Sequence, residues 1–283
     1  MKTALFSINT GSCAEPDTCV EVAQAAEAAG FDSVWTAEHV VLPDPRVPPS
    51  PMAPLDPILD PAVALAYVAA RTSTIRLGTG IIILPQRNPL VLAKELATLD
   101  VLSKGRLLFG VGVGYLEPEF RALGVSMDER GRRTEEYLEA MRMVWSNDAP
   151  AYSGRFVNFG GIQSRPRPVQ QPTPPIHMGG NGPAGWRKSV THAHGWYGFH
   201  QNLEQTAAAI AGIASARATY ERPGWLGDQI EISITPPAGP VERATAGAYA
   251  DLGVDRLILL PPGRATRDEL LRFVEAARPL VDL

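Results

Sequence analysis

Several features are scarce in this sequence, and each scarcity excludes a class of protein. There are two cysteines in 283 residues, Cys13 and Cys19, and their spacing fits neither a redox C-x-x-C motif nor half of a zinc site. No apolar run approaches the length of a membrane span. The apolar run that opens the chain breaks at residues 9–11, too early for a signal peptide. We therefore expect a cytoplasmic protein with two reduced thiols and no membrane contact.

Positive charge is not in excess either. The 26 Lys and Arg residues are outnumbered by 30 Asp and Glu residues, and the charges are interspersed rather than collected in runs. Without a basic surface, nucleic acid is not an expected partner. Lysine is rare, with four residues against 22 arginines, and together with abundant alanine this suggests a GC-rich genome. The remaining composition, 45% hydrophobic and 20% charged, is that of an ordinary globular protein.

Short apolar strands alternate with amphipathic helices along the chain, which predicts parallel βαβ units. Helices are predicted near 16–29, 60–71, 89–104, 129–147, 183–192, 202–220, 240–252 and 266–279. The strands that precede them are predicted at Thr3–Asn9, Ser33–Thr36, Ile75–Leu84, Arg106–Gly112, Pro175–Gly179, Gly195–Phe199, Gln229–Thr235 and Asp255–Leu260. Eight such units predict an α/β fold with one domain over residues 1–283, a single (β/α)8 TIM barrel. A doubly wound sheet rarely has eight such even units.

Two longer connections interrupt this rhythm. The stretch 40–61 after the second strand is rich in proline, and the stretch 148–174 before the fifth strand contains a predicted hairpin at 152–156. Barrel chemistry takes place on the loops that follow the strands. The first connection is therefore either a substrate lid or a rigid cover.

Polar residues at the C-terminal ends of the strands are the candidates for chemistry. Glu38 and His39 follow the second strand, where a histidine beside a carboxylate can exchange a proton near neutral pH. The alternative is a loop histidine that bonds local backbone. Gly78-Thr79-Gly80-Ile81 in the third strand marks a bulge, a close approach of a flat group, or a barrel corner without a ligand. The run Gly110 to Tyr115, which includes Gly112, suits a ring-binding pocket better than a nucleotide loop.

The fifth strand ends in Gly179-Gly180-Asn181-Gly182, and Pro183 then fits the first position of a helix. Exposed amides in a glycine turn and a helix N-terminus together form an anion site without a lysine. The stretch 260–264 after the eighth strand is a weaker phosphate site because its two prolines lack amide donors. The histidines have no spacing for metal ligation, so no metal is expected, and His177 is expected to pack in the barrel interior.

Together these segments resemble the bacterial luciferase-like monooxygenase family, especially its coenzyme F420-dependent oxidoreductases. The most specific stretch runs from Arg87-Asn88-Pro89 through 97–106 to Gly114. Further matching segments are Gly30–His39, Thr74–Gly124, Gly131–Trp145, Arg165–Gly180 and Gly195–Trp196, whereas the last third of the chain matches poorly.

The resemblance implies a role for each candidate residue. His39 resembles the active-site histidine beside the reactive ring, with Glu38 as its acidic neighbour. Thr79, Gly80 and Ile81 resemble the strand behind the ring, with a non-prolyl cis peptide between Gly80 and Ile81. The turn that holds the cofactor phosphate corresponds to Met178, Gly179, Gly180 and Asn181, and the acidic tail of F420 would then run near Arg187 and Lys188. Tyr115 stands where some sugar-phosphate dehydrogenases of the family carry a glutamate, which argues against their substrate.

The expected activity is hydride transfer between F420 and a small organic substrate, with His39 or else Tyr115 as the proton-transfer group. One alternative is an FMN-dependent monooxygenase that needs a separate flavin reductase, and another is a non-catalytic flavin-binding barrel. A barrel hydrolase or aldolase would need paired carboxylates or a buried lysine at strand ends. Since relatives are commonly dimers, the resemblance also implies a homodimer.

Overall fold

Parallel strands close into a ring in the computed structural model, which describes residues 1–281. The pairings of β1 with β2 and β11, and of β3 with β5, leave no free edge. Because β3 and β4 share the third position, the ring has eight strand positions, and the predicted (β/α)8 barrel is confirmed. The ring strands are β1 (Lys2–Phe6), β2 (Ser33–Thr36), β3 (Arg76–Thr79), β4 (Ile82–Ile83), β5 (Leu107–Gly112), β8 (Ile176–Gly179), β9 (Gly195–Phe199), β10 (Glu231–Thr235) and β11 (Arg256–Leu259).

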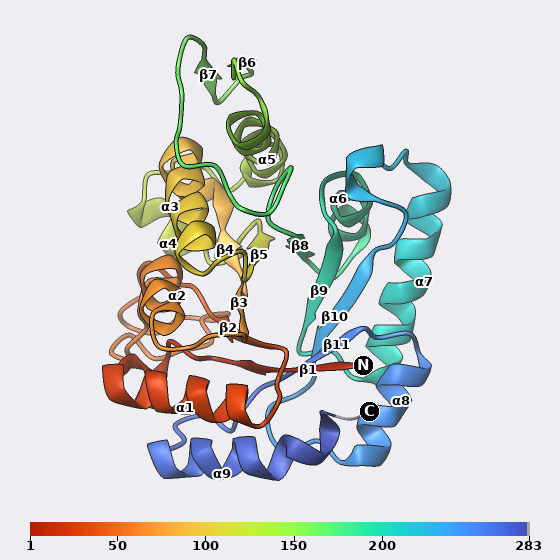
Figure 1. Ribbon diagram of the computed structural model, residues 1–283. Helices are drawn as coiled ribbons and strands as arrows, with labels where there is room; N and C mark the ends of the chain where they lie inside the picture. Colours follow the sequence, from red (N-terminus) through yellow and green to blue (C-terminus); the bar gives the residue numbers. More distant parts are fainter. Residues whose placement is uncertain (282–283) are drawn as a thin grey trace.

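Helices surround these strands, and one follows each position of the ring (Figure 1). Local sequence sets several of their starts, since Asp60 and Asn88 accept hydrogen bonds from the first-turn amides of α2 and α3, and a proline follows each of them. The eight predicted helices are α1 (Pro16–Ala28), α2 (Pro61–Ala69), α3 (Pro89–Leu102), α5 (Arg130–Ser146), α6 (Pro183–His192), α7 (Leu203–Thr219), α8 (Arg243–Asp251) and α9 (Arg267–Ala277). An unpredicted short helix, α4 (Glu117–Ala122), follows β5.

Both long connections are confirmed. Residues 37–60 link β2 to α2, and residues 147–175 link α5 to β8. The second contains the antiparallel strands β6 (Tyr152–Ser153) and β7 (Asn158–Phe159), which lie beyond α5 and away from the barrel (Figure 1). The Glu136 carboxylate on α5 holds this hairpin by accepting hydrogen bonds from three of its backbone amides. The hairpin is thus fixed to the outside of the helix layer.

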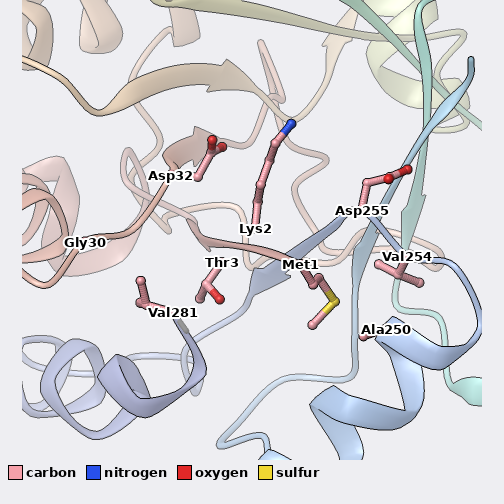
Figure 2. Close-up of a pocket in the computed structure, with 9 residues that line it drawn as sticks. All are labelled: Met1, Lys2, Thr3, Gly30, Asp32, Ala250, Val254, Asp255 and Val281. Carbon is pink, nitrogen blue, oxygen red and sulfur yellow. The ribbon is translucent and has the colours of Figure 1, made fainter. Parts of the chain in front are cut away.

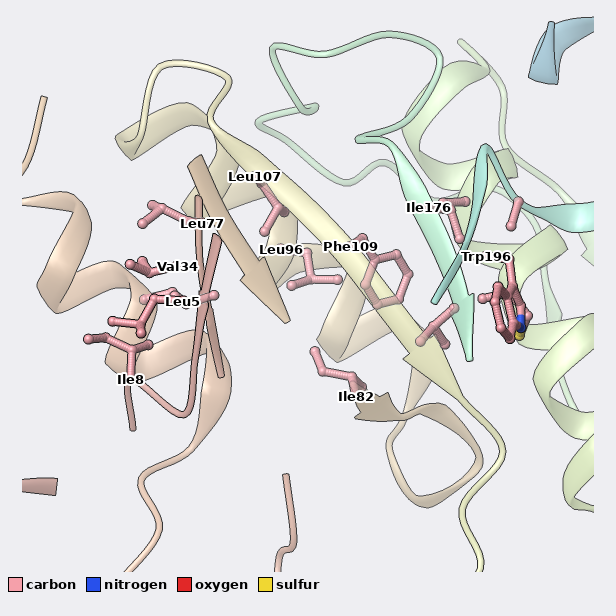
Figure 3. Close-up of a cluster of buried hydrophobic side chains, with 14 of the residues drawn as sticks. Leu5, Ile8, Val34, Leu77, Ile82, Leu96, Leu107, Phe109, Ile176 and Trp196 are labelled. Carbon is pink, nitrogen blue, oxygen red and sulfur yellow. The ribbon is translucent and has the colours of Figure 1, made fainter. Parts of the chain in front are cut away.

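Apolar side chains form two layers because successive residues of a strand face opposite sides of the sheet. Leu5, Val34 and Leu77 point outward into the core between strands and helices, which also contains Phe109 and Trp196 (Figure 3). A smaller inner cluster fills the barrel itself and consists of Ala4, Phe6, Trp35, Leu108, Tyr197 and Ile258.

Trp35 is the largest side chain of the inner cluster and is fully buried. A Cβ atom on Gly78 would lie 2.2 Å from Cδ2 of the indole. A Cβ atom on Gly110 would lie 1.7 Å from the carbonyl oxygen of Thr79 and 3.2 Å from Cζ3 of Trp35. The flat group that approaches these two strand glycines is therefore a side chain of the protein.

Charged residues occupy the barrel end opposite the loops that follow the strands. The guanidinium of Arg256, which is fully buried, contacts Glu231 and donates a hydrogen bond of 2.9 Å to Asp32. Lys2 pairs with Glu231 at 2.8 Å. A pocket of about 580 Å³ opens beside this network, lined by Met1, Lys2, Thr3, Gly30, Asp32, Ala250, Val254, Asp255 and Val281 (Figure 2). Because barrel active sites lie at the other end, this pocket is not the candidate site.

Both cysteines are free, as expected, and both are buried. Burial raises the pKa of the Cys13 thiol to about 12 and that of Cys19 to about 11, so neither is a reactive thiolate at neutral pH. Within residues 1–281, the helices are all too short or too polar to cross a membrane.

The buried imidazole of His177 makes stability depend on pH. It packs edge-on against Trp35 with ring centroids 5.6 Å apart, and burial, partly opposed by Glu231, lowers the pKa of His177 to about 3. Below pH 6.5 the unfolded chain binds a proton at this residue that the folded chain excludes, so stability falls as pH drops from 6.5 toward 3. As the pH falls from 7.5 to 5, we expect His177 to lower the free energy of unfolding by about 2 kcal/mol.

Urea unfolding of wild type and His177→Leu at these two pH values checks this. The variant should lose less stability on acidification, whereas His200→Asn, a change at an exposed loop histidine, should behave as wild type. Equal pH dependence in wild type and His177→Leu would contradict the assignment.

Candidate functional site

His39 lies just beyond β2 at the mouth of the barrel, the end where the strands terminate, and it is held by a buried carboxylate. Its Nδ1 atom lies 3.1 Å from Oε2 of Glu119, a residue of α4 that is 1% exposed. The other oxygen of Glu119 accepts a hydrogen bond of 2.6 Å from the amide of Val40. Since a carboxylate accepts hydrogen bonds, the proton of a neutral His39 lies on Nδ1, and Nε2 is left as the acceptor.

Tyr115 completes this arrangement. Its hydroxyl lies 3.2 Å from Nε2 of His39, and the two rings meet edge to face. Burial, and then the charge of Glu119, raises the pKa of Tyr115. The phenol therefore stays protonated, and its O–H donates a hydrogen bond to Nε2 of His39. Glu119, His39 and Tyr115 therefore form a chain of hydrogen bonds that ends in a half-exposed tyrosine at the mouth.

Sequence reasoning missed Glu119. The available signal was Glu117-Pro118, an acidic residue and a proline in the first turn of a helix after the fourth strand position. That signal places α4, but it does not show that residue 119 meets residue 39, which is 80 positions away.

Glu38 faces away from His39. Its carboxylate accepts hydrogen bonds from the amide of Ile83 and from Nε of Arg87, the latter at 2.8 Å. Burial raises the pKa of Glu38, although the charge of Arg87 and the Ile83 amide act in the opposite direction. The acidic group bonded to His39 is Glu119, and Glu38 belongs instead to an ion pair beneath the loop.

The third-strand segment forms part of an apolar floor at the mouth. The peptide between Gly80 and Ile81 is cis, as predicted. The side chain of Ile81 covers Gly112, where a Cβ atom would lie 1.8 Å from Cδ1 of Ile81. Thr79 is fully buried and donates a hydrogen bond of 2.7 Å to the carbonyl of Gly110.

Aromatic side chains extend this floor across the mouth. Phe6 from β1 packs against Phe199 from β9 with ring centroids 5.2 Å apart, and Phe199 remains 39% exposed. Ile81 packs against the inner cluster that contains Phe6. An exposed phenyl ring beside a partly buried isoleucine is a surface suited to a flat aromatic ligand.

The glycine turn forms the start of α6. Gly180 has a φ of 124°, and a Cβ atom on Gly185 would lie 2.5 Å from the carbonyl oxygen of Gly180, so the turn packs directly on the helix. The N-cap residue is Gly182, and no side chain caps the helix. The first amides of α6 are therefore available to an anion such as a phosphate.

Four other residues near this turn differ in orientation. Asn181 is exposed beside it, whereas Met178 is fully buried in the outer core, so its side chain faces the helices rather than the mouth. Arg187 and Lys188 pair with Glu135 at 2.5 and 3.3 Å.

Among residues 1–281, no cluster of three or more His, Cys, Asp or Glu residues has a geometry that holds a metal ion.

Comparison with known proteins gives the family. A model described as luciferase-like monooxygenase matches residues 3–241, so the chain belongs to the luciferase-like monooxygenase family. An uncharacterized protein of Mycobacterium tuberculosis is 32% identical over 267 residues, which cover 91% of this chain and 92% of that protein.

Relatives with named activities use two kinds of cofactor. The F420-dependent hydroxymycolic acid dehydrogenase of Mycobacterium tuberculosis is 28% identical over 249 residues, covering 82% of this chain and 64% of the dehydrogenase. The oxygenase component of the flavin-dependent trigonelline monooxygenase of Acinetobacter baylyi is 32% identical over 169 residues, covering 59% of this chain and 44% of that protein.

Solved structures show the same fold. The monooxygenase RslO1 from Streptomyces bottropensis superimposes with a TM-score of 0.79 at 24% identity. An F420-dependent secondary alcohol dehydrogenase also gives 0.79, at 17% identity. Each comparison covers 99% of this chain and 98% of the other.

Proposed function

We propose that this protein is an F420-dependent oxidoreductase that transfers a hydride between the deazaflavin and a small organic substrate, an alcohol or its carbonyl form, at the barrel mouth. The observation that carries the proposal is His39, held between Glu119 and Tyr115 beside the apolar floor. Interconversion of an alcohol and a carbonyl moves a proton at the substrate oxygen as well as a hydride at carbon. A histidine at the mouth whose Nε2 accepts a hydrogen bond, here from the Tyr115 hydroxyl, provides that proton transfer once a substrate oxygen replaces the hydroxyl.

The residues present fit a phosphate-bearing ring cofactor. The amides of the uncapped α6 N-terminus and the turn Gly179–Gly182 would hold the phosphate. Ile81, Phe6 and Phe199, backed by the strand of Thr79 and Gly80, would support the ring. When bound, the deazaflavin supplies the two-electron hydride chemistry, and the protein supplies position and a proton.

The chain Glu119–His39–Tyr115 defines how the proton moves. Oxidation of an alcohol delivers the hydroxyl proton to Nε2 of His39, and reduction of a carbonyl returns it to the oxygen. Glu119 keeps Nδ1–H oriented and stabilises the imidazolium while the extra proton is present. Tyr115 occupies Nε2 until a substrate oxygen replaces its hydroxyl.

Two observations favour F420 over FMN. The F420-dependent dehydrogenase aligns over more of this chain than the flavin-dependent monooxygenase does. The arginine-rich, lysine-poor composition also fits a GC-rich genome, which is common among organisms that make F420. The alternative is an FMN-dependent monooxygenase with a separate reductase. A non-catalytic flavin-binding barrel is a weaker alternative, since it has no need of the buried His39–Glu119 pair.

Absorption titrations of the purified protein with F420 and with FMN test the cofactor. We expect tight F420 binding and weak FMN binding. Gly180→Val should weaken F420 binding by about 10- to 100-fold, because each lost hydrogen bond to a charged group removes roughly 1.5–3 kcal/mol. Gly247→Val, at a glycine of α8 with open space around it, should bind as wild type. Tight FMN binding without F420 binding would favour the monooxygenase, and binding of neither would refute the proposal.

Replacement of His39 tests the proton-transfer role. His39→Ala should lower turnover by about 10² to 10⁴, the usual contribution of a positioned acid or base, while F420 affinity changes little. Glu119→Gln should lower turnover less, because the imidazole remains but loses its orienting charge. Tyr115→Phe removes only the donor to Nε2 and is the companion variant. If chemistry is rate-limiting and His39→Ala turns over as fast as wild type, a group other than His39 transfers the proton.

We further propose a homodimer that forms through α2 and α3. Val63 on α2 is 70% exposed and Val91 on α3 is 56% exposed, and Tyr67 and Leu102 add further exposed apolar surface on these two packed helices. No residue of Pro61–Ala69 is charged. An exposed apolar face such as that of α2, which carries no charge, is typical of a surface that another chain covers, and the commonest partner is a second copy.

Light scattering of Val63→Asp/Val91→Asp tests the dimer. The double variant should elute as a monomer where the wild type is a dimer, because each new carboxylate would be buried without a partner. The matched control is Tyr220→Asp, beyond the end of α7, where a similarly exposed apolar residue should be replaceable without effect. A monomeric wild-type protein, or a double variant that stays dimeric, would contradict the proposal.

A further inference from the structure

The connection 37–60 that begins with the site residues is pinned at both ends by Asn9. The side-chain amide of Asn9 donates hydrogen bonds to the carbonyls of Ala37 at 2.9 Å and Leu59 at 2.6 Å. Its side-chain oxygen accepts a hydrogen bond of 2.8 Å from the amide of Ala37. Asn9 is fully buried, so these bonds hold the first and the penultimate residues of the connection together.

Arg87 forms a second clamp one residue further along at each end. It donates to Oε1 of Glu38 from both Nε, at 2.8 Å, and Nη2. The same Nη2 atom donates a hydrogen bond of 2.7 Å to Oδ2 of Asp60. Asp60 also caps α2 through its other oxygen, and Glu38 also accepts from the amide of Ile83 on β4. One guanidinium therefore bridges two carboxylates, one at each end of the connection.

The body of the connection is braced by its own contacts. The guanidinium of Arg46 donates to the carbonyl of Ser50 at 2.9 Å, and the amide of Ala53 donates to the carboxylate of Asp56 at 2.8 Å. Seven prolines between residues 40 and 60 restrict the backbone further. Because the body is stiff, the two clamps at its base decide where it lies relative to the barrel.

We infer that Arg87 is a positioning residue that, by bridging Glu38 and Asp60, holds His39 in contact with Glu119. His39 directly follows Glu38, and the next amide, that of Val40, donates to the same Glu119 carboxylate. Any shift of Glu38 therefore moves the imidazole and this amide relative to Glu119 together. The kinetic consequences of this inference rest on the proposed function. The effect of Arg87 on the position of the connection 37–60 is independent of that function.

The bridge needs an arginine. A planar guanidinium presents several N–H donors in a fixed fork and so reaches two carboxylates at once, whereas a lysine ammonium is a compact charge with a different geometry. Arg87 contacts neither His39 nor the glycine turn in any hydrogen bond or ion pair of the described residues. Its loss should therefore change turnover and leave F420 binding unaffected.

A double-mutant cycle tests this inference. Because Arg87→Ala would leave the buried Glu38 carboxylate without its counter-charge and is prone to unfold, the cycle uses Arg87→Lys and Asp60→Asn. Asn retains the oxygen that caps α2. In the wild-type background each change should lower kcat about 5- to 20-fold, with F420 affinity unchanged within twofold. In the His39→Ala background each change should alter kcat less than twofold, because the effects of coupled residues are not additive.

Hydrogen exchange supplies a readout that needs no activity. The amides of Val40 and Val41, which bond Glu119, should exchange at least tenfold faster in Arg87→Lys and in Asp60→Asn than in wild type. Arg264→Ala is the matched control, because Arg264 lies 3.9 Å from Asp56 in the body of the same connection and away from its base. It should leave exchange and kcat unchanged.

Two results would overturn the inference. One is an equal loss of kcat in the wild-type and His39→Ala backgrounds, which would mean that Arg87 acts without His39. The other is amide exchange at Val40 and Val41 that is as slow in Arg87→Lys and in Asp60→Asn as in wild type. If the protein has no F420-dependent activity, the proposed function fails by itself, and the exchange measurement still decides whether Arg87 holds the connection.

Discussion

The fit of Trp35 into the barrel is the constraint on which the rest of the structure depends. A side chain larger than glycine at position 78 would overlap the indole, and one at position 110 would meet the Thr79 backbone beside it. The indole therefore fills the centre of the ring, and its N–H donates to Ser33, whose hydroxyl bonds Asp32 in the charged end. The same side chain thus forms the base of the apolar mouth and the roof of the buried ion network.

Trp35 thus separates the buried ion network at one end of the barrel from the candidate site at the other end. At one end, the fully buried Arg256 is compensated by Asp32 and Glu231. At the other end, the mouth contains both the neutral, apolar floor of Phe6, Ile81 and Phe199 and the His39 imidazole. A proton-transfer group beside an apolar surface is effective because little water competes for its hydrogen bonds. The Glu119–His39–Tyr115 chain and the α6 N-terminus then supply the polar groups on which the proposed reaction depends.

Local patterns predicted most of the fold but not the side-chain partners. Periodicity located all eight strand–helix units, and residues 179–183 were recognised as a turn before a helix because glycine and proline act through backbone geometry. The partners of Glu38 and His39 were inaccessible because Arg87 and Glu119 are distant in sequence and meet only in the closed ring. The side chain of Met178 points outward, as strand alternation requires, whereas the resemblance concerned only the backbone amides of this turn.

A crystal structure of the protein with F420 bound tests the central claim most directly. The account predicts the phosphate on the amides of the turn Gly179–Gly182, the ring against Ile81, and Nε2 of His39 turned toward the substrate space above the ring. Cofactor bound elsewhere, for example in the pocket that α9 forms with the segment before α8, at Pro240, Phe273 and Ala277, would contradict it. So would a ring at the mouth that leaves His39 sealed against Tyr115 with no room for a substrate oxygen.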